Sequence, residues 1–236
     1  MVIDRLRPDL DPPANDGRGV PYYLLLADIS GYTAFLSRVE STHQVDLSGV
    51  MPAGYEILGQ LLEAVVGGIQ PAFAVEQIEG DAVFASAAAD ALDGQGEATL
   101  ALLRTAYDAF SERREHAKAT TDHICTACPL VGTLELKYIL HRGTAIRLRT
   151  RVHSDLHSPA VNVVHRLLKN DIRERIDYQP YIFCTEQAAA SLGLSGGGLQ
   201  HDEIYADVGT ISGEIFTIAK TATRSPSSSR PPPANV

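Results

Sequence analysis

The chain of 236 residues is long enough for one domain but short for two, and its 44% of apolar residues allow a sizeable core. The formal net charge of −9, with no cluster of lysine or arginine, argues against nucleic acid as a partner. No apolar run approaches the roughly 20 residues of a membrane span, and the charged start of the chain lacks the layout of a signal peptide. We therefore expect a cytoplasmic protein without membrane contact.

The two ends of the chain are predicted to lie outside the folded domain. Residues 1–20 are rich in proline, aspartate and glycine, which favour loops, so we expect a flexible lead-in. Residues 222–236 contain too few large apolar side chains to offset the entropy of ordering, so we expect a disordered tail. One domain is predicted over residues 21–221, with no internal repeat.

Within this domain the apolar residues recur with the period of strands and of helices in turn. Residues 22–29 form a continuous apolar run, which is typical of a buried central strand. Aliphatic residues at helical spacing predict an amphipathic helix over residues 57–69. In chain order we expect a strand at 22–29, helices at 33–39 and 57–69, a hairpin within 73–85, a helix from 100 into the charged run 112–118, strands at 134–141 and 144–150, a helix at 159–168, a strand at 181–184, a helix at 186–192, and closing strands at 204–206 and 214–219.

This order suits an α/β fold of one domain, with a mixed or antiparallel sheet and helices packed against one face. The charged run 112–118 is expected to lie in solvent. Cys184 stands alone in an apolar strand pattern and is expected to be buried.

Two acidic residues lie where a predicted strand meets a turn. Asp28 comes near the end of the first strand, and Asp81 follows Gly80 at the tip of the hairpin. A carboxylate in such a place is desolvated unless a cation compensates it, and a pair on adjacent strands suits Mg²⁺. The alternative is that Asp28 caps the following helix and Asp81 is a turn residue. Spacing alone leaves both interpretations open.

Four segments resemble, in order, the motifs of class III adenylyl and guanylyl cyclases. LLADISGYTAFL resembles their opening strand, QIEGDAVFA their metal-site hairpin, LKYILHRG their strand ending in His-x-Gly, and DLHSPAVNVVHRLLKN their helix with Val-Asn-x-x-x-Arg. The resemblance implies a ferredoxin-like cyclase fold. The segment HRLLKN, the long polar link at residues 40–53 and the insertion at residues 116–131 are similar to a divergent bacterial family of cyclase-like proteins whose function is not established.

The resemblance assigns roles to individual residues. Asp28 and Asp81 match the carboxylates that bind two Mg²⁺ or Mn²⁺ ions, with the backbone carbonyl of Ile29 as a further ligand. Asn162 and Arg166 match the pair that orients the ribose and stabilises charge on the reacting phosphate. They are four residues apart, so a helix projects both from one face.

Two further positions match the residues that read the base, and these are Gln77 and Asp155. The implied reaction is attack of the ribose 3′-oxygen of ATP or GTP on the α-phosphate, which forms a 3′,5′-cyclic nucleotide and pyrophosphate. In the family the metal ligands and the Asn/Arg pair come from opposite subunits. The resemblance therefore implies a homodimer with sites at its interface.

Three positions depart from the cyclase pattern. Gln77 stands where adenylyl cyclases usually carry a lysine, Ser212 where the family has a triphosphate-binding lysine, and Ser158 where it has a glycine. Losing a cation that binds polyphosphate costs transition-state stabilisation. Two functions therefore stay open: a cyclase signalling through its cyclic product, or an inactive cyclase-homology domain that binds nucleotide or a protein partner as a regulatory module.

The insertion at residues 116–131 has no place in the cyclase pattern. It holds His123, Cys125 and Cys128, which offer three ligands for zinc, with a fourth from His116, His141 or a partner subunit. The alternative is a pair of reduced thiols in a surface loop. His141 itself matches a structural position of the family, and we assign it no catalytic role.

Overall fold

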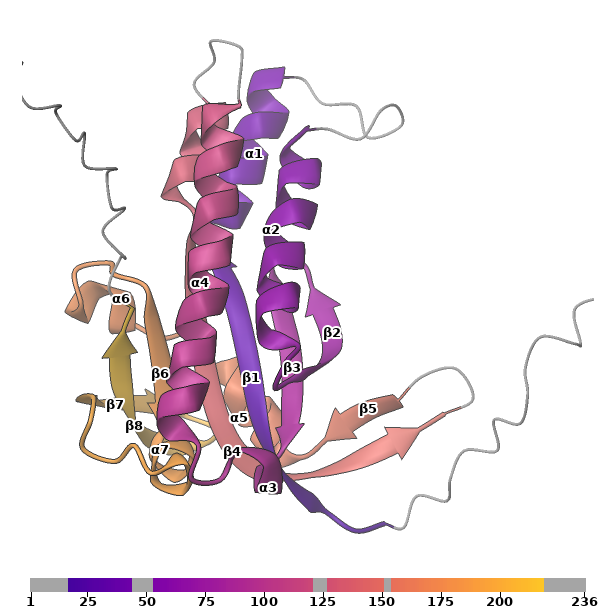
Figure 1. Cartoon of the computed structure of the whole chain (residues 1–236), viewed down its shortest axis with the longest axis vertical. Coiled ribbons are helices and arrows are strands. Elements are labelled where there is room, and N and C mark those ends of the chain that lie inside the picture. Colours follow the sequence, from indigo (N-terminus) through magenta and orange to yellow (C-terminus); the bar gives the residue numbers. More distant parts are fainter. Residues whose placement is uncertain (1–16, 44–52, 121–126, 151–153, 219–236) are drawn as a thin grey trace, which may run out of the picture.

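The computed structural model describes residues 17–43, 53–120, 127–150 and 154–218. Within these residues, eight strands form one sheet in the order β2-β3-β1-β4-β6-β8-β7, with β5 paired to β4 (Figure 1). The strands are β1 (Val20–Ser30), β2 (Ala74–Glu79), β3 (Ala82–Ala88), β4 (Glu135–Arg149), β5 (Ser154–His157), β6 (Tyr181–Thr185), β7 (Leu199–Tyr205) and β8 (Gly209–Thr217). The helices are α1 (Tyr32–His43), α2 (Ala53–Ile69), α3 (Ala89–Leu92), α4 (Gly96–Ala119), the 3₁₀ helix η1 (Cys128–Thr133), α5 (Pro159–Arg166), α6 (Ile172–Arg175) and α7 (Glu186–Leu192).

The sheet is mixed, as expected. Strand β4 runs parallel to β6, and the other paired strands are antiparallel. The predicted fold class, a mixed sheet with helices, is confirmed. None of the helices in the described part of the chain is long and apolar enough to cross a membrane.

Strand β1 lies in the middle of the sheet because its side chains are apolar on both faces. Tyr23, Leu25 and Ala27 belong to a core shared with α2, α4 and α7. Leu24 and Leu26 belong to a second core, shared with α5 and α6. A strand covered on both faces reads as a continuous apolar run, and this confirms the prediction for residues 22–29.

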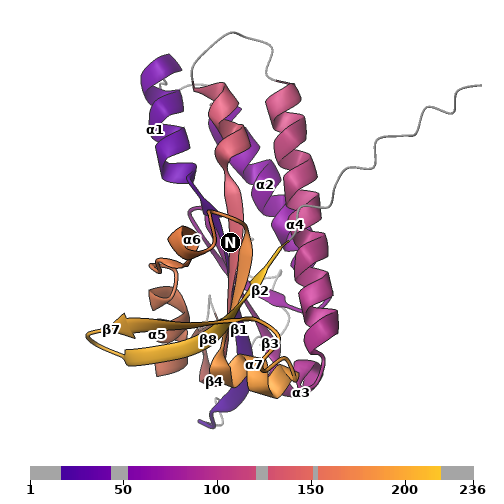
Figure 2. The same ribbon diagram turned by 90° about the vertical axis from the view of Figure 1, so that its left-hand side faces the viewer.

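The main helical layer, α2 and α4, covers one face of the sheet (Figure 1). The opposite face carries the shorter helices α5 and α6, which the expectation of helices on a single face did not include (Figure 2). Their apolar stripe is short, with Val164 and Ile172 fully buried. Periodicity therefore predicts α5, but neither α6 nor the face of the sheet that the two helices cover. This second face holds α5, the helix that carries Asn162 and Arg166.

The predicted break between two strands, at residues 134–141 and 144–150, is wrong, because β4 is one continuous strand across both ranges. It pairs with β1 as far as Ala145, and beyond β1 it pairs with β5, a strand that was not predicted. Gly143 suggested a turn, but it lies within the strand opposite Tyr22. A Cβ atom built on Gly143 would lie 2.3 Å from the Cβ of Ala160, at the start of α5. The glycine therefore allows α5 to lie close against the sheet.

We expect Gly143→Ala to lower the free energy of unfolding by about 1–3 kcal/mol, because the added methyl group overpacks the contact with α5. Chemical denaturation measures this change. Gly59→Ala is a matched control, since Gly59 lies in α2 with no atom within 4 Å of its added Cβ. That variant should be more stable than the wild type, by about 0.5–1 kcal/mol. Equal stability of the two variants would contradict the close-contact role of Gly143.

The charged run 112–118 is not wholly solvated, because Arg114 is only 4% exposed. Its guanidinium donates to the carbonyl of Leu134 at 2.7 Å and to the carboxylate of Glu135 at 3.0 Å. The contact joins α4 to the start of β4. A charge run does not reveal that one member has a partner twenty residues further along the chain.

Candidate functional site

The two predicted metal-binding carboxylates lie at adjacent ends of strands. Asp28 is near the end of β1, opposite Ala82 of β3. Asp81 lies in the two-residue turn between β2 and β3, where Gly80 takes a φ of +65° that suits glycine. The amide N–H of Ile29 donates to the carbonyl of Asp81 at 3.0 Å and so attaches the turn to β1. The side chain of Ile29 is fully buried, so this residue offers the site only its backbone.

The local charges fit a divalent cation. Burial raises the pKa of the Asp81 carboxyl, and the neighbouring Asp28 raises it further. A like-charge pair that is partly desolvated is unfavourable unless a cation joins it. Two carboxylates with a nearby backbone carbonyl are the hard oxygen donors that Mg²⁺ and Mn²⁺ prefer.

A lysine that sequence reasoning missed stands beside the carboxylates. Lys137 of β4 is the register partner of Asp28, and its Nζ lies 3.3 Å from the Asp28 carboxylate. The same Nζ donates to the carbonyl of Leu168, just after α5, at 2.8 Å. Lys137 therefore partly balances the two carboxylates and connects them to the end of α5. Only the pairing of β1 with β4 brings it there.

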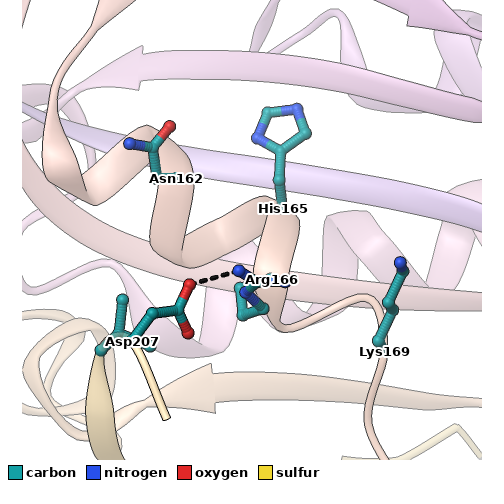
Figure 3. A pocket seen from close by; sticks show the side chains of 6 residues that line it. Asn162, His165, Arg166, Lys169 and Asp207 are labelled. Carbon is teal, nitrogen blue, oxygen red and sulfur yellow. Dashed lines mark hydrogen bonds and ion pairs between the residues drawn. The ribbon is translucent and has the colours of Figure 1, made fainter. Parts of the chain in front are cut away.

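Asn162 and Arg166 lie together, as expected from their spacing. Both line a cavity of about 370 Å³ beside α5, together with His165, Lys169, Asp207 and Val208 (Figure 3). Helix α5 begins at Pro159 because the side chain of Ser158 caps it and accepts the N–H of Val161 at 3.2 Å. The serine that replaces the family's glycine is therefore an N-cap.

The cavity gathers charged groups from segments far apart in the sequence. The Arg166 guanidinium forms an ion pair with Asp207, in the turn between β7 and β8, and this contact lowers the pKa of Asp207 (Figure 3). His165 faces the carbonyl of Val161 at 2.8 Å and the carboxylate of Glu79 at 3.2 Å. Both partners are hydrogen-bond acceptors, and together they engage the two ring nitrogens. Sequence reasoning missed these contacts because no local pattern joins α5 to the β7–β8 turn.

Among the described residues that line the cavity, neither Asp28 nor Asp81 is found. Two further predicted residues also lie elsewhere. Gln77 is exposed on β2, next to a β-bulge, and Asp155 lies on β5, opposite Leu148, in a two-stranded arm that extends from the sheet (Figure 1).

The predicted zinc ligands are only partly visible. His123 and Cys125 lie outside the described residues. Cys128 is buried, and its Sγ lies 3.5 Å from Nε2 of His43, a residue that was not among the expected ligands. His141 was one of the expected fourth ligands, but it hydrogen-bonds Thr185 at 3.0 Å. The zinc site at the insertion therefore gains no support.

Asp171, His201 and Glu203 form the one cluster of potential metal ligands found in the described parts of the chain. Arg175 donates to Nδ1 of His201 at 3.0 Å, so Nε2 carries the ring proton and donates to Glu203 at 2.7 Å. Both ring nitrogens are thus engaged. In this structure the cluster forms a hydrogen-bonded network.

The burial of His141 makes a prediction about pH. Burial lowers the pKa of His141 from 6.5 to about 4, so between these values the unfolded chain binds a proton that the folded chain does not. The stabilisation is complete above pH 6.5 and is lost on acidification toward pH 4. Between pH 7 and pH 5 we expect this residue to account for about 2 kcal/mol of lost unfolding free energy. Denaturation of His141→Gln at both pH values should show a smaller loss, while His157→Gln, at an exposed histidine of β5, should behave as the wild type. Equal losses in all three proteins would contradict this.

The fold is similar to that of solved nucleotide cyclases. A bacterial light-regulated adenylyl cyclase matches with a TM-score of 0.57 at 16% identity, over 84% of this chain and 52% of that one. The adenylyl cyclase CyaB from P. aeruginosa matches with a TM-score of 0.56 at 13% identity, over 84% and 95%. The guanylyl cyclase Cya2 matches with a TM-score of 0.56 at 13% identity, over 87% and 96%. At these identities the likeness shows the fold.

Sequence comparison identifies a family. The "Uncharacterized protein Rv2561/Rv2562" of Mycobacterium tuberculosis is 28% identical over 140 residues. The match covers 58% of this chain and 61% of that protein, so the chain spans less than two thirds of its relative's length. Residues 58–178 match the family described as "Protein of unknown function (DUF2652)". This match extends over more than half of the chain. The chain therefore has the fold of the adenylyl and guanylyl cyclases, and it belongs to the DUF2652 family.

Proposed function

We propose that this chain is a divergent nucleotide cyclase domain that binds a purine nucleoside triphosphate with divalent metal ions and converts it to the 3′,5′-cyclic nucleotide and pyrophosphate. The observation that carries the proposal is the pair of partly buried carboxylates, Asp28 and Asp81, at neighbouring strand ends. Burial and the neighbouring Asp28 raise the pKa of the Asp81 carboxyl, and a bound cation would offset both effects. The likeness to cyclase folds supports the same function.

The chain's own residues have distinct tasks in this proposal. Asp28, Asp81 and the Ile29 carbonyl hold the ions, which supply the charge that activates the 3′-oxygen and neutralises the leaving pyrophosphate. Asn162 orients the ribose, and Arg166 stabilises the charge that develops on the α-phosphate. Positioning and electrostatics then account for the rate, without covalent chemistry on the protein.

A homodimer is part of this proposal, and the composition of the cavity lining supports it. The carboxylates do not line the cavity that holds Asn162 and Arg166. A two-fold arrangement in which the carboxylates of one copy face the cavity of another would complete two equal sites. The role of Gln77 and Asp155 in reading the base, the cytoplasmic location and the choice of ATP or GTP belong to the same proposal.

A second candidate function is nucleotide binding without turnover, in a regulatory module. Two observations favour it. Ser212 lies in β8, at the position where the resemblance implies a phosphate-binding lysine. The Arg166 guanidinium already forms an ion pair with Asp207. A site that lacks one cation and has another neutralised is poorly suited to stabilise a triphosphate in its transition state.

Product analysis separates the two functions. The full chain is incubated with ATP or GTP and Mn²⁺ and analysed for 3′,5′-cyclic nucleotide, with the Asp28→Ala/Asp81→Ala double variant as control. Product that is lost in the control establishes a cyclase. Metal-dependent binding of the triphosphate without product establishes the binding module. If the chain shows neither binding nor product, both functions are refuted.

A further inference from the structure

The cavity beside α5 contains a lysine that pairs with no carboxylate of the described residues. Lys169 lies in the turn after α5, and its amide donates to the carbonyl of Arg166 at 3.1 Å. Its own carbonyl accepts the Tyr205 hydroxyl of β7 at 3.3 Å. The backbone of Lys169 is therefore held both by the helix end and by the closing hairpin. Among the described residues, no carboxylate forms an ion pair with Lys169.

The other cation of the cavity has an exchangeable partner. The side chains of Arg166 and Asp207 are 44% and 52% exposed, and an ion pair exposed to this degree contributes little to stability. A polyphosphate offers Arg166 more oxygen atoms and more charge than one carboxylate does. Asp207 is therefore a weak resident counter-charge that an anionic ligand can replace.

The basic groups suit a chain of phosphates rather than a single one. Arg166 and Lys169 come from one helix end, and both line the same cavity. Asp207 is the single acid among the lining residues. Ser212, where the resemblance expects the phosphate-binding lysine, is not part of this lining.

We propose that Lys169 is the polyphosphate-binding cation of this site, acting with Arg166, and that Asp207 holds Arg166 until the polyphosphate replaces it. The inference rests on the proposed function and deepens it. Lys169 replaces, from the helix side of the cavity, the lysine that the closing hairpin lacks. Asp207 also weakens the binding of small anions in the cavity, because each anion must compete with the Asp207 carboxylate for the Arg166 guanidinium.

The two residues predict opposite changes in affinity. Isothermal titration calorimetry of the full chain with Mg²⁺ measures the binding of ATP, AMP and inorganic tripolyphosphate. Lys169→Gln should weaken ATP and tripolyphosphate about tenfold, and AMP much less, because a charged hydrogen bond to the outer phosphates is lost. Asp207→Asn should tighten ATP and tripolyphosphate about threefold to tenfold, because it removes the competitor of the phosphate.

Matched controls remove the same charges elsewhere. Lys118→Gln takes a positive charge from the exposed end of α4, and Asp202→Asn takes a negative charge from β7, in the same hairpin as Asp207. Neither should change the affinities more than about twofold, because both charges are exposed to solvent and lie outside the cavity lining. All four side chains are exposed, and equal melting temperatures would show that the fold is intact.

The outcomes separate this inference from the proposed function. Metal-dependent ATP binding that Lys169→Gln leaves unchanged overturns the inference and keeps the function. Tripolyphosphate binding that needs Lys169, with no preference for ATP over tripolyphosphate, supports the inference and counts against the nucleotide function. Weaker binding by Asp207→Asn overturns the role of Asp207 as a competitor, and no binding of any ligand overturns both proposals.

Discussion

Asp81→Asn is expected to abolish metal-dependent nucleotide binding and at the same time to make the metal-free protein slightly more stable. The carboxamide removes one of the two charges that hold the ions, so the affinity for the metal–nucleotide complex should fall by at least about 100-fold. The same change relieves the repulsion by Asp28 and the cost of burying a second carboxylate. Because Asp81 is partly exposed, we expect a gain of only about 0.5 kcal/mol.

Two measurements on the same variant test this expectation. Calorimetry with ATP and Mn²⁺ measures the affinity, and thermal unfolding in the presence of a chelator measures the stability of the metal-free chain. Asp202→Asn, at an exposed aspartate of β7, is the control for removing a negative charge. Loss of binding with a retained or raised melting temperature supports a metal ligand. A variant that unfolds would instead make Asp81 a structural turn residue, and one that binds normally would exclude it from the site.

Arg166→Ala is expected to reduce turnover far more than binding. In the proposed reaction the guanidinium meets the charge that develops on the phosphate, so its loss should lower kcat by about 100-fold to 1000-fold. In the resting chain the same guanidinium is neutralised by Asp207, so its removal costs less ground-state affinity, about tenfold or less. Lys169 remains to hold the polyphosphate.

The separation of kcat from KM decides the assignment of Arg166. Initial rates of cyclic product formation over a range of ATP concentrations give both quantities. Arg173→Ala is the control, since Arg173 belongs to α6 and lies over the ring of Tyr178, outside the cavity lining. Equal losses in kcat and in affinity would count against a transition-state role. A variant that loses affinity alone would make Arg166 a binding residue.

The elements that form the frame of this fold are readable from local sequence. The apolar run of β1 and the helical stripe of α2 each bury a face that their own spacing defines, and Gly80 marks the turn between β2 and β3. The spacing of Asn162 and Arg166 likewise places both on one face of α5, and the structure brings them to one cavity. These features depend on residues within a few positions of one another.

The remainder of the site depends on contacts between distant segments, and only the tertiary structure decides them. The register of β1 with β4 brings Lys137 to Asp28, and the β7–β8 turn brings Asp207 to Arg166. The continuity of β4 through Gly143 likewise depends on its pairing with β1, which a glycine in isolation does not predict. Periodicity indicates which face of a strand or helix a side chain occupies. The residue that pairs with a charged side chain is determined by the order of the strands and by the packing of the helices on the sheet. Local sequence alone therefore predicts the central strand, the main helices, the two carboxylates and the Asn162/Arg166 pair. The continuity of β4, the presence of β5 and the charged partners of the candidate residues depend on the sheet topology.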